Sequence, residues 1–256
     1  MSLIEAYNVE KHYQLGRTTV PALRGVSFSV HPGEFISIMG PSGCGKTTLL
    51  NVMGCIDTAT AGTVLIEGRN VEELTDNQEA DLRLHTVGFI FQSFNLIPVL
   101  NIYENIEFPT ILAGTSRRNR REWIMHLIEE VGLQEFVDHK PDELSGGQRQ
   151  RVAIARALVN KPRVVIADEP TANLDSETGE MVIQVMRELN VRDKVTFIFS
   201  THNPEVNKHA GRVIQLRDGL IAGEERRHGG QSPPGPATGS TTAGAGQSDS
   251  PEAGER

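Results

Sequence analysis

A glycine-rich segment that directly follows a short apolar run constrains the fold of this chain more than any other feature. The run, residues 35–39, reads FISIM and is typical of a buried strand, and residues 40–47 then read GPSGCGKT. Residues 48–53 continue with the apolar spacing of a helix. The glycines let successive backbone N–H groups point inward at phosphate oxygens, and the helix N-terminus adds the positive end of its dipole. The pattern therefore predicts a phosphate-binding loop between a strand and a helix.

The residues of this loop have separate expected roles. Lys46 would reach the β- and γ-phosphates of a nucleotide, and the Thr47 hydroxyl would ligate Mg²⁺. The other residues expected to contact the nucleotide here are Gly40, Pro41, Ser42, Gly43, Cys44, Gly45 and Thr48. A glycine-rich turn that merely joins a strand to a helix is the alternative, and the strand and helix around the motif argue against it.

Two adjacent carboxylates end a second apolar run. Residues 163–167, RVVIA, read as a buried strand, and Asp168 and Glu169 follow it. Asp168 would face Mg²⁺, normally through water, and Glu169 could polarise an attacking water as a general base. In isolation, two acids that cap a strand at the surface are a plausible alternative. Beside a phosphate-binding loop the pair predicts hydrolysis of a nucleotide.

The phosphate-binding loop alone leaves several classes of nucleotide-hydrolysing protein open. A GTPase would need the guanine-reading motif Asn-Lys-x-Asp. The Asn-Lys pair at residues 160–161 is followed by Pro162 and Arg163, so it does not form that motif.

The order of the predicted elements is that of an α/β protein. Strand-like runs are expected at residues 3–9, 20–30, 35–39, 63–67, 163–167, 195–200 and 212–216. A largely helical region, from about Gln92 to Asn160, separates the first four runs from the last three. Strands, a helical insert and further strands indicate a mostly parallel, buried sheet. The Asp-Gly pair at residues 218–219 predicts a terminal hairpin.

Composition limits the alternatives further. Residues 229–256 are rich in Gly, Pro, Ser and Thr and contain no Leu, Ile, Val or Phe, so we expect a disordered tail after a domain at residues 1–228. The formal net charge of −8 argues against a dedicated nucleic-acid binder. Residues 1–5 have neither the basic start nor the apolar stretch of a signal peptide, and no apolar run comes near the ~20 residues that a membrane-spanning helix needs, so we expect a cytoplasmic protein. Cys44 and Cys55 are expected to be packing residues in a reducing compartment.

Residues 144–148, LSGGQ, resemble the signature motif of ABC ATPases, and residues 149–151 continue the resemblance. Ser145, Gly146 and Gly147 begin a predicted helix and would form a second anion-binding nest, with Gln148 beside it. One chain then has two elements that could bind phosphate, the loop at residues 40–47 and the signature, but only the loop carries a lysine. In the ABC family, nucleotide is sandwiched between the phosphate-binding loop of one subunit and the signature of another. The resemblance therefore implies a homodimer that forms on ATP binding.

The same resemblance implies roles for further residues. Tyr13 is similar to the aromatic residue that stacks on adenine, with a packing residue at a strand edge as the alternative. Gln92 matches the Q-loop glutamine, which contacts Mg²⁺ and water and reports to the membrane partner. Residues 172–175, ANLD, match the D-loop, whose aspartate, Asp175, faces the opposite subunit. His202 matches the switch histidine that hydrogen-bonds the γ-phosphate. The implied catalytic residues are Lys46, Gln92, Glu169 and His202. The implied metal ligands are Thr47, Gln92 and Asp168.

The resemblance covers about residues 2–225 and implies a P-loop NTPase fold with a RecA-like core. An antiparallel β subdomain and a helical subdomain, at about residues 93–160, are expected beside that core. The sequence departs from many relatives at Ala172 and Asn203. Neither position is expected to touch the catalytic carboxylate, so we expect activity to survive.

The function implied is that of an ATP-hydrolysing transporter subunit that uses ATP and Mg²⁺. It would drive an integral-membrane permease at the cytoplasmic face of the inner membrane and would not bind nucleic acid. Within the family, the chain is most similar to the lipoprotein-release and macrolide-exporter group (LolD-like, MacB-like and FtsE-like). The residues that carry this likeness are 21–23, 54–57, 88–92, 95–98 and 173–175. The alternatives are a soluble ABC ATPase that acts on DNA or ribosomes, and a regulatory module that binds ATP without hydrolysing it.

Overall fold

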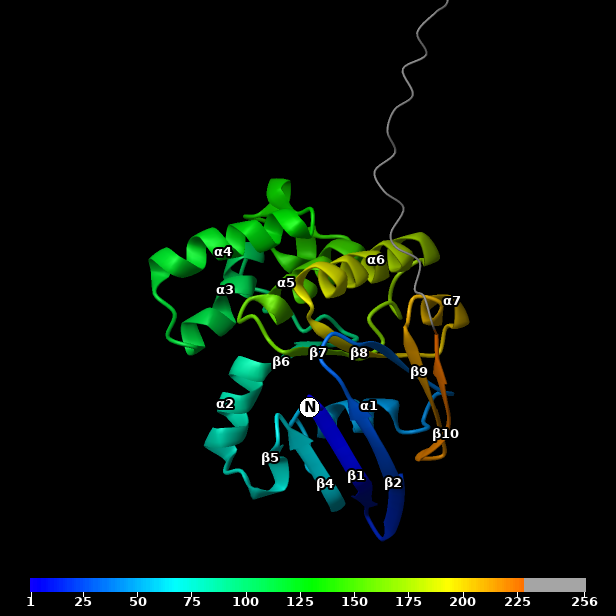
Figure 1. Ribbon diagram of the computed structural model, residues 1–256. Coiled ribbons are helices and arrows are strands. Elements are labelled where there is room, and N and C mark those ends of the chain that lie inside the picture. Colours follow the sequence, from blue (N-terminus) through cyan, green and yellow to red (C-terminus); the bar gives the residue numbers. More distant parts are fainter. Residues whose placement is uncertain (228–256) are drawn as a thin grey trace, which may run out of the picture.

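A six-stranded sheet lies at the centre of the computed structural model, which describes residues 1–227 (Figure 1). Its strand order is β10–β9–β3–β8–β7–β6. The bounds are β3 (Phe35–Met39), β6 (Val87–Ile90), β7 (Val164–Ala167), β8 (Thr196–Thr201), β9 (Arg212–Arg217) and β10 (Leu220–Arg226). All neighbours pair in parallel except β9 and β10, which form the predicted hairpin. Every residue of β7 and β8 is buried, as expected for strands covered on both faces.

A second, antiparallel sheet packs beside the first. Its order is β2–β1–β4–β5, with bounds β1 (Ile4–Leu15), β2 (Thr18–Val30), β4 (Ala61–Ile66) and β5 (Arg69–Asn70). Together with the parallel core, this sheet confirms the predicted α/β P-loop fold with an antiparallel β subdomain.

Helices cover the central sheet. They are α1 (Lys46–Met53), α2 (Asp76–Thr86), α3 (Ile102–Leu112), α4 (Arg117–Glu130), α5 (Gly146–Leu158), α6 (Ser176–Asp193) and α7 (Pro204–Asn207), with short 3₁₀ turns at Val71–Glu73, Gln134–Phe136 and Pro141–Glu143. In Figure 1, α3 to α6 lie on one side of the sheet, and α1 lies on the other side together with the antiparallel sheet. Two apolar cores result from this arrangement. Phe197 and Phe199 of β8 face the helical layer, whereas Ile198 faces α1.

Sequence patterning misses α2. Its only buried residues are Leu82 and Thr86, so the segment has no apolar stripe with helical spacing. The expected tail, residues 229–256, lies outside the described residues, and the proposed domain boundary at residue 228 therefore stays a prediction. Within residues 1–227, no helix is both long enough and apolar enough to cross a membrane.

Candidate nucleotide site

The phosphate-binding loop joins the carboxyl end of β3 to α1 and depends on glycine at defined positions. Gly45 caps α1 with φ +105°, in the left-handed region that glycine tolerates best. A Cβ atom on Gly45 would also lie 2.5 Å from the Ala22 carbonyl oxygen. Backbone conformation and close packing therefore both require glycine here, and the loop holds its shape against β2.

Lys46 is buried, with 5% of its surface exposed. Its Nζ donates hydrogen bonds to the carbonyl oxygens of Gly40 (2.9 Å) and Pro41 (3.1 Å). The same atom lies 3.6 Å from Glu169 Oε1. The ammonium group is thus fixed within the loop and linked to the carboxylate at the end of β7.

Asp168 and Thr47 meet directly, although 121 residues separate them in the sequence. The Thr47 hydroxyl donates to Asp168 Oδ2 at 2.8 Å, and the Ser200 hydroxyl donates to Asp168 Oδ1 at 2.7 Å. Ser200 Oγ also accepts a hydrogen bond from the Glu169 backbone N–H at 2.8 Å. Sequence reasoning missed Ser200, although its place two residues before His202 at the end of a buried run was a usable signal. Its hydroxyl fixes the Asp168 carboxylate and the backbone of Glu169.

This pair of oxygen groups suits a hard cation. Within residues 1–227, no cluster of three or more His, Cys, Asp and Glu side chains could hold a metal ion by itself. Mg²⁺ is commonly bound through one or two protein oxygens, with substrate phosphates and water completing its shell. Thr47 and Asp168 fit that requirement, and Gln92 lines the same cavity.

Glu169 occupies an unusual backbone conformation between two partners. Its φ is +43°, in the left-handed region that non-glycine residues adopt only when their surroundings enforce it. One carboxylate oxygen faces Lys46, and the other lies 3.2 Å from His202 Nδ1. The strained conformation and the two flanking partners fit the role expected of Glu169, which stays a prediction.

A cavity of about 350 Å³ lies over Lys46, Thr47 and Glu169, and its size suits a small ligand. It is lined by Tyr13, Ala22, Ser42, Gly43, Gly45, Lys46, Thr47, Thr48, Gln92 and Glu169. Ala22 is the one lining residue that the sequence did not predict. The structure therefore brings most of the predicted loop residues together with Gln92 and Glu169 at the carboxyl edge of the parallel sheet, where ligands bind in folds of this kind. Gly40, Pro41 and Cys44 were predicted to contact the nucleotide but do not line the cavity.

Tyr13 is held at the rim of the cavity by polar contacts. Its hydroxyl donates to Asp57 Oδ2 at 2.7 Å, and Lys11 Nζ lies 5.1 Å from the ring centre. Partial burial and the Asp57 carboxylate raise the pKa of the Tyr13 hydroxyl. The ring is therefore fixed in orientation, and its expected stacking on adenine stays a prediction.

The signature residues do not line this cavity. Ser145 caps α5, accepting a hydrogen bond from the Gln148 N–H (3.2 Å) while its own N–H donates to Gln148 Oε1 (2.8 Å). A Cβ atom on Gly147 would collide with the Thr178 side chain of α6. Asp175 caps α6 by accepting from the Thr178 N–H at 3.0 Å, and this bond lowers the pKa of its carboxyl group. The signature and the D-loop therefore pack against each other, and their contact with nucleotide stays a prediction.

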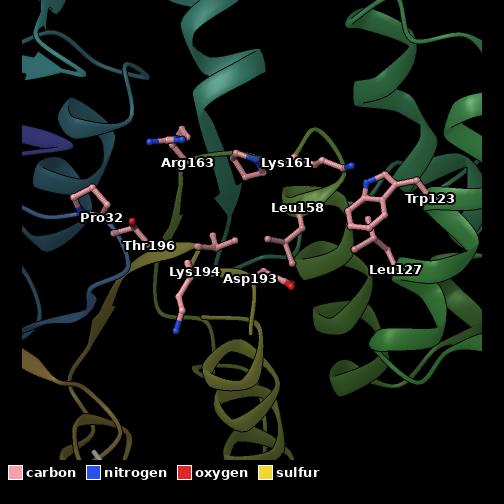
Figure 2. Close-up of a pocket in the computed structure, with 11 residues that line it drawn as sticks. Pro32, Trp123, Leu127, Leu158, Lys161, Arg163, Asp193, Lys194 and Thr196 are labelled. Carbon is pink, nitrogen blue, oxygen red and sulfur yellow. The ribbon is translucent and has the colours of Figure 1, made fainter. Parts of the chain in front are cut away.

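A larger cavity, of about 540 Å³, lies at the opposite edge of the sheet. Its lining includes Pro32, Arg163 and Thr196, which lie at or just before the amino ends of β3, β7 and β8. Figure 2 shows its cationic side chains diverging: Lys161 extends toward Trp123, and Arg163 extends the other way. Lys161 Nζ lies 4.6 Å from the centre of the Trp123 ring. Because its cations do not converge, this cavity lacks the arrangement found at the phosphate-binding loop.

A phosphate-binding loop, an acid pair and a histidine at one edge of a parallel sheet define a P-loop nucleoside triphosphatase. Residues 23–172 match the family model described as "ABC transporter". The chain belongs to this family and is an ATPase of the ABC type.

Relatives of known sequence are similar over most of the chain. The macrolide export ATP-binding/permease protein MacB of Syntrophobacter fumaroxidans is 48% identical over 226 residues, which are 88% of this chain and 32% of the relative. An uncharacterized ABC transporter ATP-binding protein of Thermotoga maritima is 48% identical over 225 residues, 88% of this chain and 96% of the relative. The chain therefore spans about one third of MacB and nearly all of the Thermotoga protein.

A solved structure supports the same fold. It is described as a dimeric structure of a post-hydrolysis state of the ATP-binding cassette MJ0796 bound to ADP and Pi, a protein of Methanocaldococcus jannaschii. It has a TM-score of 0.82 and 43% identity, and the match covers 88% of this chain and 99% of that one. The names of these relatives favour the transporter interpretation over the alternative of an ATPase that acts on DNA or ribosomes.

Proposed function

We propose that this chain binds MgATP, pairs with a second copy across two nucleotides and drives an integral-membrane permease at the cytoplasmic face of the inner membrane. The observation that carries the proposed mechanism is the position of Glu169, which lines the nucleotide cavity together with Lys46 and has His202 at its second carboxylate oxygen. A cation, a carboxylate and an imidazole are the groups that hold a γ-phosphate and activate water beside it.

Each group has a defined task in the proposed reaction. Lys46 and the loop N–H groups bind the phosphates and neutralise their charge. Glu169 Oε accepts the proton of the attacking water, and His202 orients that carboxylate and hydrogen-bonds the γ-phosphate. Asp168 and Thr47, with Gln92, would hold Mg²⁺, which when bound supplies Lewis-acid stabilisation of the phosphate oxygens.

Separation of the signature from the cavity supports the proposed dimer. Ser145 stands at the exposed N-terminus of α5, where backbone N–H groups attract an anion, yet it does not line the cavity of its own chain. A second copy placed head to tail would bring its Ser145 against the nucleotide. The dimeric form of the MJ0796 cassette favours this arrangement.

The permease proposal is supported by the MacB relatives. Their name joins an ATP-binding part to a permease, and this chain spans about a third of their length. We propose a permease of the lipoprotein-release or macrolide-export type as the partner. With a formal net charge of −8, the chain is poorly suited to a nucleic-acid partner.

Replacing Lys46 tests the nucleotide site. Lys46→Ala is expected to weaken MgATP binding about 10- to 100-fold, because charge-assisted hydrogen bonds to the phosphates are lost. Titration calorimetry measures the dissociation constant. Lys161→Ala, which removes a lysine from the opposite edge of the sheet, is the matched control and should leave the constant unchanged. An unchanged dissociation constant in Lys46→Ala would refute the assignment of the phosphate-binding loop.

A further inference from the structure

The Q-loop leaves the nucleotide cavity through a strained turn. Two residues after Gln92, Phe94 has φ +61°, and the next residue, Asn95, has φ +48°. Single non-glycine residues enter this left-handed region, but consecutive ones seldom do. The turn is closed by a hydrogen bond of 3.1 Å from the Phe94 N–H to the Phe91 carbonyl. A conformation of this kind persists only where neighbouring groups hold it.

Two arginines of α5 hold this turn. Arg156 donates one guanidinium N–H to the Phe94 carbonyl at 2.7 Å and another to the Asn95 carbonyl. The Arg149 guanidinium lies 5.3 Å from the centre of the Phe94 ring. These arginines are seven residues apart, about two helical turns, so they share one face of α5.

The contact between Arg156 and the turn depends on the shape of the guanidinium group. Its planar fork presents two N–H donors at once and matches two successive carbonyl oxygens. A lysine ammonium at the same place is a single point charge. Burial lowers the pKa of Arg156, but an arginine stays protonated, so its charge must be satisfied by the carbonyls it contacts.

The contact joins two functional elements. Gln92 lines the nucleotide cavity, and its carbonyl oxygen accepts a hydrogen bond from Asn173 Nδ2 of the D-loop at 2.8 Å. The helix that carries Arg156 begins at the signature residue Ser145. The hydrogen bonds of Arg156 therefore connect α5 to the turn that follows Gln92.

We propose that Arg156 is a positioning residue that fixes the turn at Phe94 and Asn95. It thereby fixes the position of Gln92 relative to α5, the helix that begins at the signature motif. This inference rests on the proposed ATPase function. Arg156 does not touch the nucleotide cavity. It fixes the position of Gln92 in the nucleotide site of its own chain, while the N-terminus of α5 contacts the nucleotide bound by the partner subunit.

The test compares two arginines of the same helix. Arg151 also donates to backbone carbonyls, those of Val131 (3.1 Å) and Gly132 (3.5 Å), but these lie in a turn that does not line the cavity. Arg156→Lys is expected to lower kcat for ATP about tenfold, because a small displacement of a positioned group is costly in rate. Arg151→Lys should keep kcat within about twofold of the wild type, while both variants melt at a lower temperature.

The dissociation constant for MgADP separates positioning from general damage. It should stay within about twofold of the wild-type value in Arg156→Lys, since Lys46 and the loop are untouched. The proposal is overturned if Arg156→Lys retains wild-type kcat, or if Arg151→Lys lowers kcat by the same factor. A wild-type protein that hydrolyses no ATP would instead refute the proposed function.

A second pair of variants changes the turn itself, at Asn95, and leaves the residues of α5 unchanged. Asn95 is exposed, so its replacement does not threaten the fold. Asn95→Ala should lower kcat about threefold, because alanine tolerates the left-handed region less well than asparagine, whereas Asn95→Gly should not. Equal, wild-type kcat values for both variants would contradict the proposal even if Arg156→Lys failed to fold.

Discussion

Glu169→Gln is expected to lower ATP turnover by about 10²- to 10⁴-fold, the range associated with loss of a general base. Glutamine keeps the size of the side chain and one hydrogen-bonding oxygen but cannot accept the proton of the attacking water. Lys46 still contacts the Gly40 and Pro41 carbonyls, and Thr47 still contacts Asp168, so ATP should bind nearly as in the wild type. The substitution therefore separates binding from chemistry.

The same variant should accumulate as a dimer with ATP. Removing one negative charge beside the γ-phosphate relieves repulsion in the closed site, and slow hydrolysis prevents the dimer from reopening. Size-exclusion chromatography with and without ATP measures the shift from monomer to dimer, which the wild type should show only weakly.

Glu180→Gln is the matched control for this experiment. Glu180 also pairs with a histidine, His209, at 2.9 Å, but it lies outside the nucleotide cavity. Turnover and elution of this variant should follow the wild type. If Glu169→Gln hydrolysed ATP at the wild-type rate, the general base would be another group and the role given to Glu169 would be wrong.

The local parts of the site were predictable because short stretches of sequence specify them. An apolar run followed by GPSGCGKT encodes a strand, a loop and a helix within about twenty residues, and β3 and α1 form there. The acid pair likewise follows β7 directly. Signals of this kind depend on backbone conformation and hydrophobic pattern, which neighbouring residues determine.

The parts that were missed depend on contacts between distant segments. Ser200 orients Asp168 only because β7 and β8 pair in parallel, with Ala167 opposite Phe199. Arg156 lies more than sixty residues from Phe94 and Asn95 in the sequence, so its hydrogen bonds to their carbonyls correspond to no local sequence pattern. Helix α2 was missed for a different reason. It buries too little apolar surface for its sequence to show the helical spacing of apolar residues.

The central claim is that each ATP site is shared by two copies of the chain, and a mixed dimer of two inactive variants should recover activity. Ser145→Arg removes the cap of α5 and places a bulky side chain at its N-terminus, while Lys46→Ala disables the phosphate-binding loop. Each variant alone has two damaged sites per dimer. A mixed dimer has one site with both substitutions and one site with neither, in which Lys46 and Glu169 of one chain face Ser145 of its partner.

ATP turnover of the mixture, compared with that of each variant alone, tests this claim most directly. Random pairing makes half of the dimers mixed, so the expected recovery is about a quarter of the wild-type rate per subunit. Differently tagged chains, co-purified in the presence of ATP, establish that the mixed dimers have formed. A recovery near a quarter is the result that the shared site predicts, and turnover no higher than that of the separate variants, with mixed dimers present, would contradict it.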